Sequence, residues 1–575
     1  MEKRTLLAVV LCMATLFIWY QLFPPPAPPP APQAPPAVGN QTAGTASAPP
    51  SAPSGEAPPP LPPEQLIQVE MPGRYRAVVT SYGAGLRSFE LLNPKYFTKD
   101  LRRMVLRPGA RHPEMDRRQT DGPTDLVTSY RPSLGIRLRG RDFKVPDVLQ
   151  QAWSLSEDTT LPDGGRRLVY TWQSAEVALR KTLVFARENY QVAMTVEVKN
   201  LKTTPVNHHL EVGLEGFQDP SQKPGGIFSA RVTQNEAAWD RSGTMQSAGL
   251  EALLERVPPD KLRGDLRWIA IAQPYFILAV AMPYGDKIGD KQGRASAEAN
   301  GLISVSAEYS ERTLAPGETA VYPVTVYAGP KLPELLDAVG VGEQTGALAT
   351  AISYSTFPVL GWLAEPLVRP LLWIMRRLHA ATGSWALAIV LLTMLVKLIT
   401  LYPTHKSMKS MKAMSELRPE IEAIKARCGD NKEKFNLEMM ALYKRHGINP
   451  LGGCLPILVQ MPIWIALYAM LSSAVELYRE PFITPRWIAD LTLADPYFIL
   501  PLATGALMYL QTKLSPPPAD PQQRMISNMM PILFTVFSLF LPAGLTLYIL
   551  TNTLLSMIQQ AVLNRSKPAL GRAKK

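Results

Sequence analysis

The chain has 575 residues and a formal net charge of +12, so it is too long for one hydrophobic core. Residues 64–350 hold 35 basic and 34 acidic residues, a net +1, so the other segments supply the remaining +11. Basic residues beside apolar segments indicate a membrane protein with anionic lipid or RNA partners, rather than a globally basic nucleic-acid binder. Cys12, Cys428 and Cys454 form no CxxC pair, and there is no HExxH helix and no GxxxxGK(S/T) phosphate loop, so no metal, no cofactor and no ATP-driven motor are expected.

The first 63 residues predict an anchor followed by a tether. An uncharged run from Thr5 to Phe23 follows the basic N-terminal residues, contains Trp19 and Tyr20 near its end and lacks an A-x-A-like cleavage site. An uncleaved transmembrane anchor is therefore predicted over 1–23, with a cleaved signal peptide as the alternative. Residues 24–63 hold 17 prolines in 40 positions, which is typical of an extended, semi-rigid linker.

Residues 64–345 are predicted to form a β-sandwich domain. Runs such as YQVAMTVEVKN and AVYPVTVYAG are rich in β-branched and aromatic residues and are separated by Gly, Pro, Asn and Asp. Many short strands in one segment favour a sandwich. His208, His209 and Glu211 resemble a sugar site, but neighbouring residues on a strand point to opposite faces. A membrane-tethered glycan-active or glycan-binding protein is therefore an alternative function only.

Residues 352–380 predict an amphipathic helix that lies on the membrane surface. Leucine and isoleucine recur at spacings of 3 and 4, while Glu365, Arg369, Arg376 and Arg377 form the polar side. The prolines within this segment predict that the helix is broken.

Five apolar segments follow, each near the roughly 20 residues that cross a bilayer: 383–403, 451–474, 495–512, 526–541 and 545–563. With the anchor they make six transmembrane helices and place both chain ends on one side. The 403–449 loop holds ten Lys and Arg, and the tail RSKPALGRAKK holds five, so both ends and this loop are predicted to be cytoplasmic and the β domain to lie on the outer side. The three arginines at 369, 376 and 377 then fall on the outer side, against this bias.

The cytoplasmic loop, 404–449, is predicted to form a helical hairpin. Met408, Met411 and Met414 recur at helical spacing, and CGDN (428–431) forms the turn. Two interpretations stay open: the two helices pack only on each other, or the methionines form an adaptable surface that receives apolar clients. The hairpin and the basic tail, 564–575, are also predicted to contact ribosomal RNA, with simple positive-inside anchoring as the alternative.

Lys397 lies within the first span of this region, where a charge is costly. Polar side chains recur at helical spacing on several spans: Thr393, Lys397 and Thr400; Gln460; Thr535; and Tyr548, Asn552 and Ser556. These faces predict either a hydrated groove open to the cytoplasm, with Lys397 at its centre, or a sealed bundle in which Lys397 extends toward the headgroups. Apart from Asp495 at the first position of 495–512, the spans hold no Asp or Glu, and they hold no acid/base pair or nucleophile triad, so neither an enzyme nor a proton-driven transporter is expected, although a solute channel stays an alternative.

Several motifs of the membrane region resemble those of the YidC membrane-protein insertases: NPLGGCLPILVQMPIWIALY (449–468), DPYFILP (495–501), MPILFTVF (530–537) and PAGLTLYILTNTLLSMIQQ (542–560). The anchor, linker and large β domain are similar to the Gram-negative form of that family. The resemblance implies a five-helix insertase core and a periplasmic β-supersandwich similar to galactose mutarotases.

The resemblance also implies a function in the bacterial inner membrane. Members insert and help fold membrane proteins, alone or with the Sec translocon, through a hydrophilic groove open to the cytoplasm and to lipid. Many members carry arginine in the groove where this sequence has Lys397, and Gln460 and Tyr548 match other groove positions. Lysine keeps the charge but lacks the bidentate fork of arginine.

Overall fold

The computed structural model describes residues 62–97, 122–129, 131–141, 145–221, 234–255, 262–264, 266–284, 291–341, 344–352, 361–429, 431–447, 455–483, 487–514 and 521–565. The predicted anchor (1–23), nearly all of the Pro-rich linker (24–63) and the predicted basic tail beyond residue 565 lie outside the described residues.

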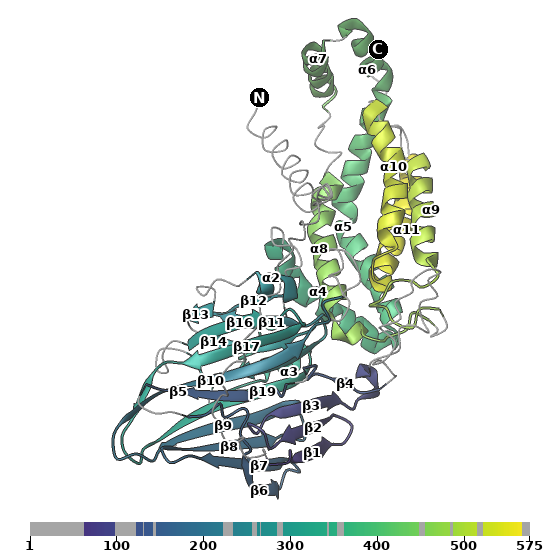
Figure 1. The fold of residues 1–575 in the computed structure, drawn as a ribbon. Coiled ribbons are helices and arrows are strands. Elements are labelled where there is room, and N and C mark those ends of the chain that lie inside the picture. Colours follow the sequence, from purple (N-terminus) through teal and green to yellow (C-terminus); the bar gives the residue numbers. More distant parts are fainter. Residues whose placement is uncertain are drawn as a thin grey trace, which may run out of the picture. The chain divides into compact units, whose positions relative to one another are not determined.

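The described strands form three antiparallel sheets (Figure 1). The first has the order β1 (Leu66–Met71), β2 (Tyr75–Thr80), β3 (Leu86–Leu91) and β4 (Thr124–Asp125). The second has the order β13 (Arg263–Gly264), β16 (Lys291–Ala297), β17 (Leu302–Tyr309), β10 (Val206–Phe217) and β18 (Arg312–Leu314), with β5 (Gly135–Arg139) also paired to β10. The third has the order β12 (Thr244–Ala248), β11 (Glu236–Arg241), β14 (Leu266–Ala272), β15 (Phe276–Ala281), β19 (Thr319–Pro330), β9 (Gln191–Asn200), β8 (Val177–Phe185), β7 (Arg166–Gln173) and β6 (Ser154–Thr160).

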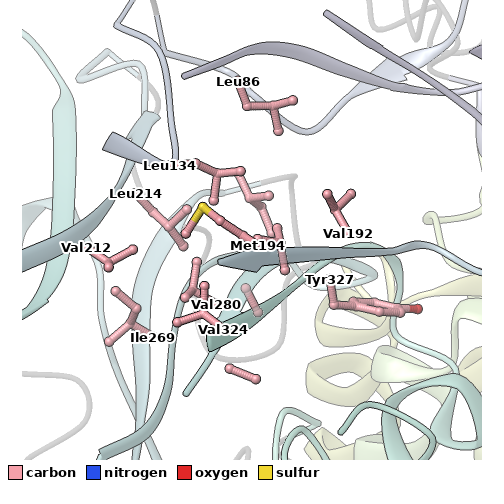
Figure 2. Packing of buried hydrophobic residues seen from close by; sticks show 14 of the residues in the cluster. Leu86, Leu134, Val192, Met194, Val212, Leu214, Ile269, Val280, Val324 and Tyr327 are labelled. Carbon is pink, nitrogen blue, oxygen red and sulfur yellow. The ribbon is translucent and has the colours of Figure 1, made fainter. Parts of the chain in front are cut away.

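One hydrophobic core is shared by these sheets. Figure 2 shows Met194 of β9 next to Leu214 of β10, and both belong to one buried cluster, so the second and third sheets contribute to the same core. Strands β8 and β9 bury alternate residues, as expected when one face of a sheet meets the core. Sheets that enclose a common core make a β-sandwich, which is the class that the sequence predicts.

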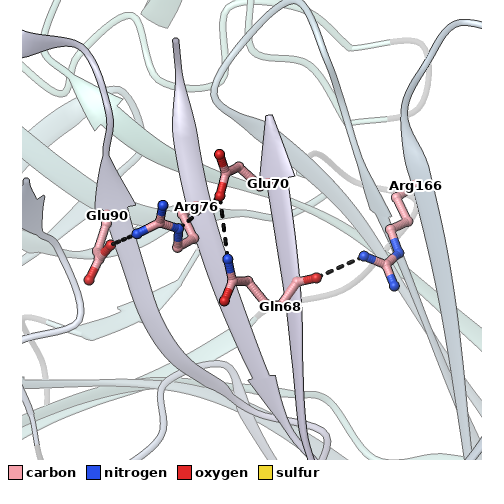
Figure 3. A network of polar contacts seen from close by, with 5 residues as sticks. All are labelled: Gln68, Glu70, Arg76, Glu90 and Arg166. Carbon is pink, nitrogen blue, oxygen red and sulfur yellow. Dashed lines mark hydrogen bonds and ion pairs between the residues drawn. The ribbon is translucent and has the colours of Figure 1, made fainter. Parts of the chain in front are cut away.

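Polar contacts join the first sheet to the third. Lys181 of β8 is fully buried, and its Nζ donates to the carbonyl oxygens of Ala84 and Leu134, each at 2.7 Å. At the edge of the same sheet, Arg166 of β7 donates to the Gln68 carbonyl of β1 at 2.7 Å, beside the ion pair of Arg76 with Glu90 (Figure 3). A buried ammonium needs such acceptors, so Lys181 fixes the loops around residues 84 and 134 against β8.

The described helices are two short ones in the β domain, α2 (Leu250–Leu254) and α3 (Pro333–Asp337), and a series from residue 361 onward: α4 (Gly361–Thr382), α5 (Trp385–Glu416), α6 (Arg418–Cys428), α7 (Lys432–Arg445), α8 (Leu455–Ser473), α9 (Ile499–Leu514), α10 (Pro521–Ser538) and α11 (Ala543–Arg565). Helix α11 packs against α5 and α9, α10 packs against α9, and α4 packs against α5 and α8 (Figure 1). Of the helices that the structure describes, the one from Trp385 to Met414 is long and apolar enough to cross a bilayer on its own composition.

Two helices differ from the sequence predictions at proline. Helix α4 runs unbroken through Pro366 and Pro370, because its buried face, which includes Val368, Leu372 and Met375, packs on neighbouring helices. Helix α5 continues past Pro403 to Glu416 instead of ending there. The hydroxyls of Thr400 and Thr404 bond to the carbonyl oxygens of Val396 and Thr400, which adds side-chain hydrogen bonds to α5 on either side of the proline.

Helices α6 and α7 form a hairpin with its own small core. Leu417, Ile421, Ile424, Cys428, Leu442 and Tyr443 are buried there. The turn passes through Gly429 at a positive φ of 54°, and Asn431 caps α7 by accepting a hydrogen bond from the Lys434 N–H at 3.0 Å. The C-terminal end of α5 also packs on this hairpin, because Met414 of α5 contacts the same cluster.

The segment 475–480, which begins with the turn η6 (Val475–Leu477) after α8, docks on the β domain. Val475 belongs to the β-domain core, and the Tyr478 ring lies 5.2 Å and 5.3 Å from the rings of Tyr275 and Phe276. Lys95, in the turn η1 (Pro94–Tyr96), forms an ion pair with Glu480 at 2.8 Å.

Helix α4 joins the same junction. The Arg376 guanidinium of α4 bonds to Glu334 of α3 and to Glu476 of the 475–480 segment, the latter from Nε at 2.8 Å. One of the three arginines on this side of the helical region is therefore neutralised by two carboxylates.

Candidate functional site

Polar side chains of α5, α8 and α11 meet along one line, which we call the polar seam: Lys397 and Thr404 of α5, Gln460 of α8, and Tyr548, Asn552, Ser556 and Gln559 of α11. Lys397 is half-buried, and its Nζ donates to Ser556 Oγ at 2.6 Å. Ser556 Oγ in turn donates to the Asn552 carbonyl oxygen at 2.7 Å, so its lone pairs face the ammonium. This contact holds the charge of α5 against α11.

Two further hydrogen bonds extend the seam. Gln559 Nε2 donates to Thr404 Oγ1 at 3.2 Å, again between α11 and α5. Gln460 Nε2 donates to the Tyr548 hydroxyl at 2.6 Å, which connects α8 to α11. On α11, Ser556 and Gln559 therefore bond to α5, and Tyr548, about two turns earlier, bonds to α8.

Among the described residues, one polar group of the seam lacks a charged partner and another lacks a hydrogen-bonding partner. Lys397 forms no ion pair with any residue that the structure describes, although an ammonium has three donors and one charge. Gln559 Oε1 is buried, and no donor from the described residues reaches it. A cation and an acceptor in this state are stabilised by water or by a polar ligand, since a buried polar group without a partner is costly.

Comparison with known proteins identifies the family. Residues 377–570 match the family model for the 60Kd inner membrane protein, and residues 116–370 match that for the YidC periplasmic domain. A membrane protein insertase YidC of Anaeromyxobacter sp. (strain K) is 37% identical over 88% of this chain and 86% of its own length. The chain belongs to the YidC family of membrane protein insertases. A second insertase of this family, from Anaeromyxobacter sp. (strain Fw109-5), is 36% identical over 99% of this chain and 98% of its own.

The solved structures include a crystal structure of an active YidC insertase, which covers 88% of this chain and 95% of its own at 18% identity and a TM-score of 0.34. As a YidC-family insertase, the chain is an inner-membrane protein whose β domain is periplasmic. The polar seam lies in the part that matches the 60Kd inner membrane protein model.

Not every residue that the sequence predicts for the insertase groove has a free side chain. Thr393 and Thr400 are buried and donate to Ile389 and Val396 carbonyls of their own helix, at 2.7 Å and 2.9 Å. Thr535 donates to the Pro531 carbonyl at 2.6 Å and packs on α9. These threonines support the helices, and the half-buried Asn552 contributes its carbonyl oxygen to the seam.

The sequence prediction left out Thr404 as a member of the insertase seam. Thr404 continues the helical spacing of residues 393, 397 and 400 by one more turn. It was left out because the helix was expected to end at Pro403. The contact of Thr404 with Gln559 depends on the crossing of two helices far apart in the sequence, which no local pattern gives.

The three methionines predicted to receive clients of the insertase differ in exposure. Met411 is exposed, Met408 is half-buried, and Met414 packs on the hairpin core. Met411 therefore presents the most apolar surface of the three, and Met408 and Met414 are both half-buried.

The histidine pair of the periplasmic domain does not form one site. His208 is fully buried, and its Nε2 lies 2.8 Å from the Tyr322 hydroxyl. His209 points to the other face of β10, near Glu308, while Glu211 forms ion pairs with Arg137 and Arg139. His208 is therefore closed to a ligand, and burial lowers its pKa to about 4.

Proposed function

We propose that this insertase receives polar segments of nascent membrane proteins in a hydrated groove lined by the polar seam, with Lys397 as its cation. The observation that carries this proposal is the half-buried Lys397, which bonds to Ser556 and has no carboxylate partner among the described residues. An ammonium without a counter-charge attracts acidic client segments over several ångströms in a medium of reduced dielectric.

The positive charge of Lys397 explains, in this proposal, the order of steps by which a client enters the membrane. A polar client segment has to cross roughly 30 Å of hydrocarbon. Water and a cation in the seam shorten the dry part of that path, and the unmet Gln559 Oε1 supports the presence of water there. The apolar helix of the client then moves sideways into lipid, driven by burial of about 25 cal/mol per Å² of apolar surface. No covalent step is involved, so we infer that the chain is not an enzyme.

We further propose the topology that the sequence predicts: six transmembrane helices, with the 404–449 hairpin and the C-terminal tail in the cytoplasm. The proposed layout is an anchor (1–23), a linker (24–63), the β domain (64–345), an interfacial helix (352–380) and spans at 383–403, 451–474, 495–512, 526–541 and 545–563, then the tail (564–575). Exposed Met411 on α5 supports a client-receiving role for the start of the hairpin.

The partners proposed beyond client proteins are the Sec translocon, the ribosome and anionic lipids. The exposed basic residues of the hairpin, such as Lys425, Arg427 and Lys444, support contact with RNA phosphates or acidic headgroups.

The test uses purified full-length protein in liposomes and a short nascent membrane protein with an acidic external segment. Protease protection of that segment is measured for the wild type, for Lys397→Ala and for Lys513→Ala, a matched control on the exposed face of α9. We expect the wild type and Lys513→Ala to protect the client, and Lys397→Ala to lose about tenfold or more.

Equal protection by Lys397→Ala would exclude Lys397 as the working cation of the groove. Solute flux through the same liposomes would instead favour a channel.

A further inference from the structure

Helix α4 presents one exposed face that no described residue covers. Trp373 is 59% exposed and Leu367 36% exposed, and Arg369 and Arg377 are exposed beside them. Positions 366, 369, 370, 373 and 377 recur at intervals of one helical turn, so these side chains share one side of α4. The opposite side, with Val368 and Met375, is buried against the helical region.

The arginines of α4 divide into two kinds. Arg376 is committed to Glu334 and Glu476 at the junction with the β domain. Arg369 and Arg377 form no ion pair with any residue whose side chain the structure describes, and the Arg377 guanidinium lies 5.4 Å from the centre of the Trp373 ring. The exposed face therefore carries two positive charges on either side of an indole.

The position of α4 at the β-domain end of the helices determines which molecules can contact this exposed face. Its link to Glu334 puts it at the β-domain end of the helices, which is the periplasmic side in this family. It ends at Thr382, and the apolar helix α5 begins at Trp385, so the face lies next to a point where the chain enters the membrane. Tryptophan is favoured at headgroup depth, and the guanidinium fork matches a phosphate.

We propose that Arg369 and Arg377, with Trp373 between them, bind phosphate headgroups of anionic phospholipids in the periplasmic leaflet. This specifies one site for the anionic-lipid partner proposed above and rests on the periplasmic placement of the β domain. It is independent of the polar seam. It also accounts for two arginines on the outer side of a protein whose basic residues next to the membrane spans are otherwise concentrated in the loop and tail predicted to be cytoplasmic, because headgroup phosphates supply counter-charge.

The experiment compares full-length proteins that differ only in two arginines. Arg369→Gln/Arg377→Gln removes the proposed site, and Arg180→Gln/Arg294→Gln removes the same charge from exposed positions on β8 and β16. Arg369→Lys/Arg377→Lys keeps the charge without the fork. Each protein is extracted from mixed phosphatidylglycerol and phosphatidylcholine bilayers, and native mass spectrometry counts the retained lipids of each kind.

We expect the wild type and the β-strand control to retain phosphatidylglycerol in preference to phosphatidylcholine. The Arg369→Gln/Arg377→Gln protein should lose that preference at least about threefold, and the lysine variant should lose less. Unchanged thermal unfolding in phosphatidylcholine checks that α4 is intact.

Equal phosphatidylglycerol retention by the glutamine variant and the wild type would overturn the proposal. So would an equal loss in the β-strand control, which would mean a general charge effect. A defect in client insertion without a change in lipid retention would instead assign this face to a protein partner and would also overturn it. Because lipid retention is measured without a client, its outcome is distinct from a failure of the Lys397 groove.

Discussion

At the scale of single residues, Lys397 shows how a costly charge is accommodated. The ammonium lies half-buried against Ser556 instead of extending alone along its own helix. Its hydroxyl partner stabilises the charge without neutralising it, as a carboxylate would. The charge therefore stays available to an incoming acidic segment.

Ser556 permits a direct test of that availability. Ser556→Asp places a carboxylate beside Lys397, so we expect insertion of an acidic client to fall to the level of Lys397→Ala. Ser556→Asn, which is neutral and of similar size to aspartate, should keep most of the activity. The measurement is protease protection in liposomes, and full activity in Ser556→Asp would show that a free charge is not required.

His208 predicts a pH dependence of the periplasmic domain. Burial lowers its folded-state pKa to about 4, against an ordinary value of 6.5, so the unfolded chain binds more protons between these two values. Stability is therefore fully present above pH 6.5 and falls as the pH drops toward 4, by up to about 3 kcal/mol.

The check is thermal unfolding of the full-length protein at pH 7 and pH 5, followed by tryptophan fluorescence. His208→Gln should show a smaller drop between these conditions than the wild type. His209→Gln, on the half-exposed face of the same strand, is the control and should behave as the wild type does. An identical drop in all three proteins would mean that other groups cause it.

At the scale of elements, helices α9 and α10 meet at Gly505. A Cβ at this position would lie 1.9 Å from Thr535 Oγ1, which is far inside contact distance. The close approach of two helices in a membrane depends on such small residues.

We therefore expect Gly505→Leu to force α9 and α10 apart and to lower stability by about 1–3 kcal/mol. Ala506→Leu adds a similar volume at the exposed neighbour and should have little effect. Thermal unfolding in detergent measures the difference. Equal stability of the two variants would show that the helices separate easily at this contact.

The limits of local sequence patterns are visible in the helix ends. Alternating burial in β8 and β9 and the apolar runs of α8 and α11 are local properties, so the sequence predicts these elements well. The start of α9 is different, because Asp495 accepts hydrogen bonds from the backbone N–H groups of Tyr497 and Leu500 and so precedes the helix that was expected to include it. The continuation of α5 past Pro403 likewise depends on threonine hydroxyls and on packing.

The same distinction applies to the site. The polar faces around Lys397 and Tyr548 follow from helical spacing, and the sequence predicts them. The pairing of Lys397 with Ser556 and of Thr404 with Gln559 follows from the contact of α5 with α11, which is a tertiary property. The 475–480 segment has no periodic pattern, so its docking on the β domain had no signal in the sequence.

At the scale of the whole molecule, that docked segment connects the β domain to the end of α8. Removal of residues 65–330 would remove Lys95, Tyr275 and Phe276, which hold the segment. The β domain therefore has its own core and also holds the segment that follows α8.

We expect Tyr478→Ala to release the segment, because the ring is packed on two aromatic side chains of the β domain. Hydrogen exchange of the amides at 475–480 should become about tenfold faster or more. Phe482→Ala is a matched control, since Phe482 packs on Trp487 within the same connection. Unchanged exchange in Tyr478→Ala would mean that the backbone contacts of the segment hold it alone.

The unbroken length of α5 has a mechanical consequence. Its 32 residues span about 48 Å at the rise of an α-helix, whereas the hydrocarbon layer is roughly 30 Å thick. One rigid rod thus carries Lys397 within the bilayer and Met411 and Met414 beyond it. Under the proposed function, in which the hairpin receives clients, a change in the tilt of this one continuous helix would move Lys397 relative to Ser556 of α11.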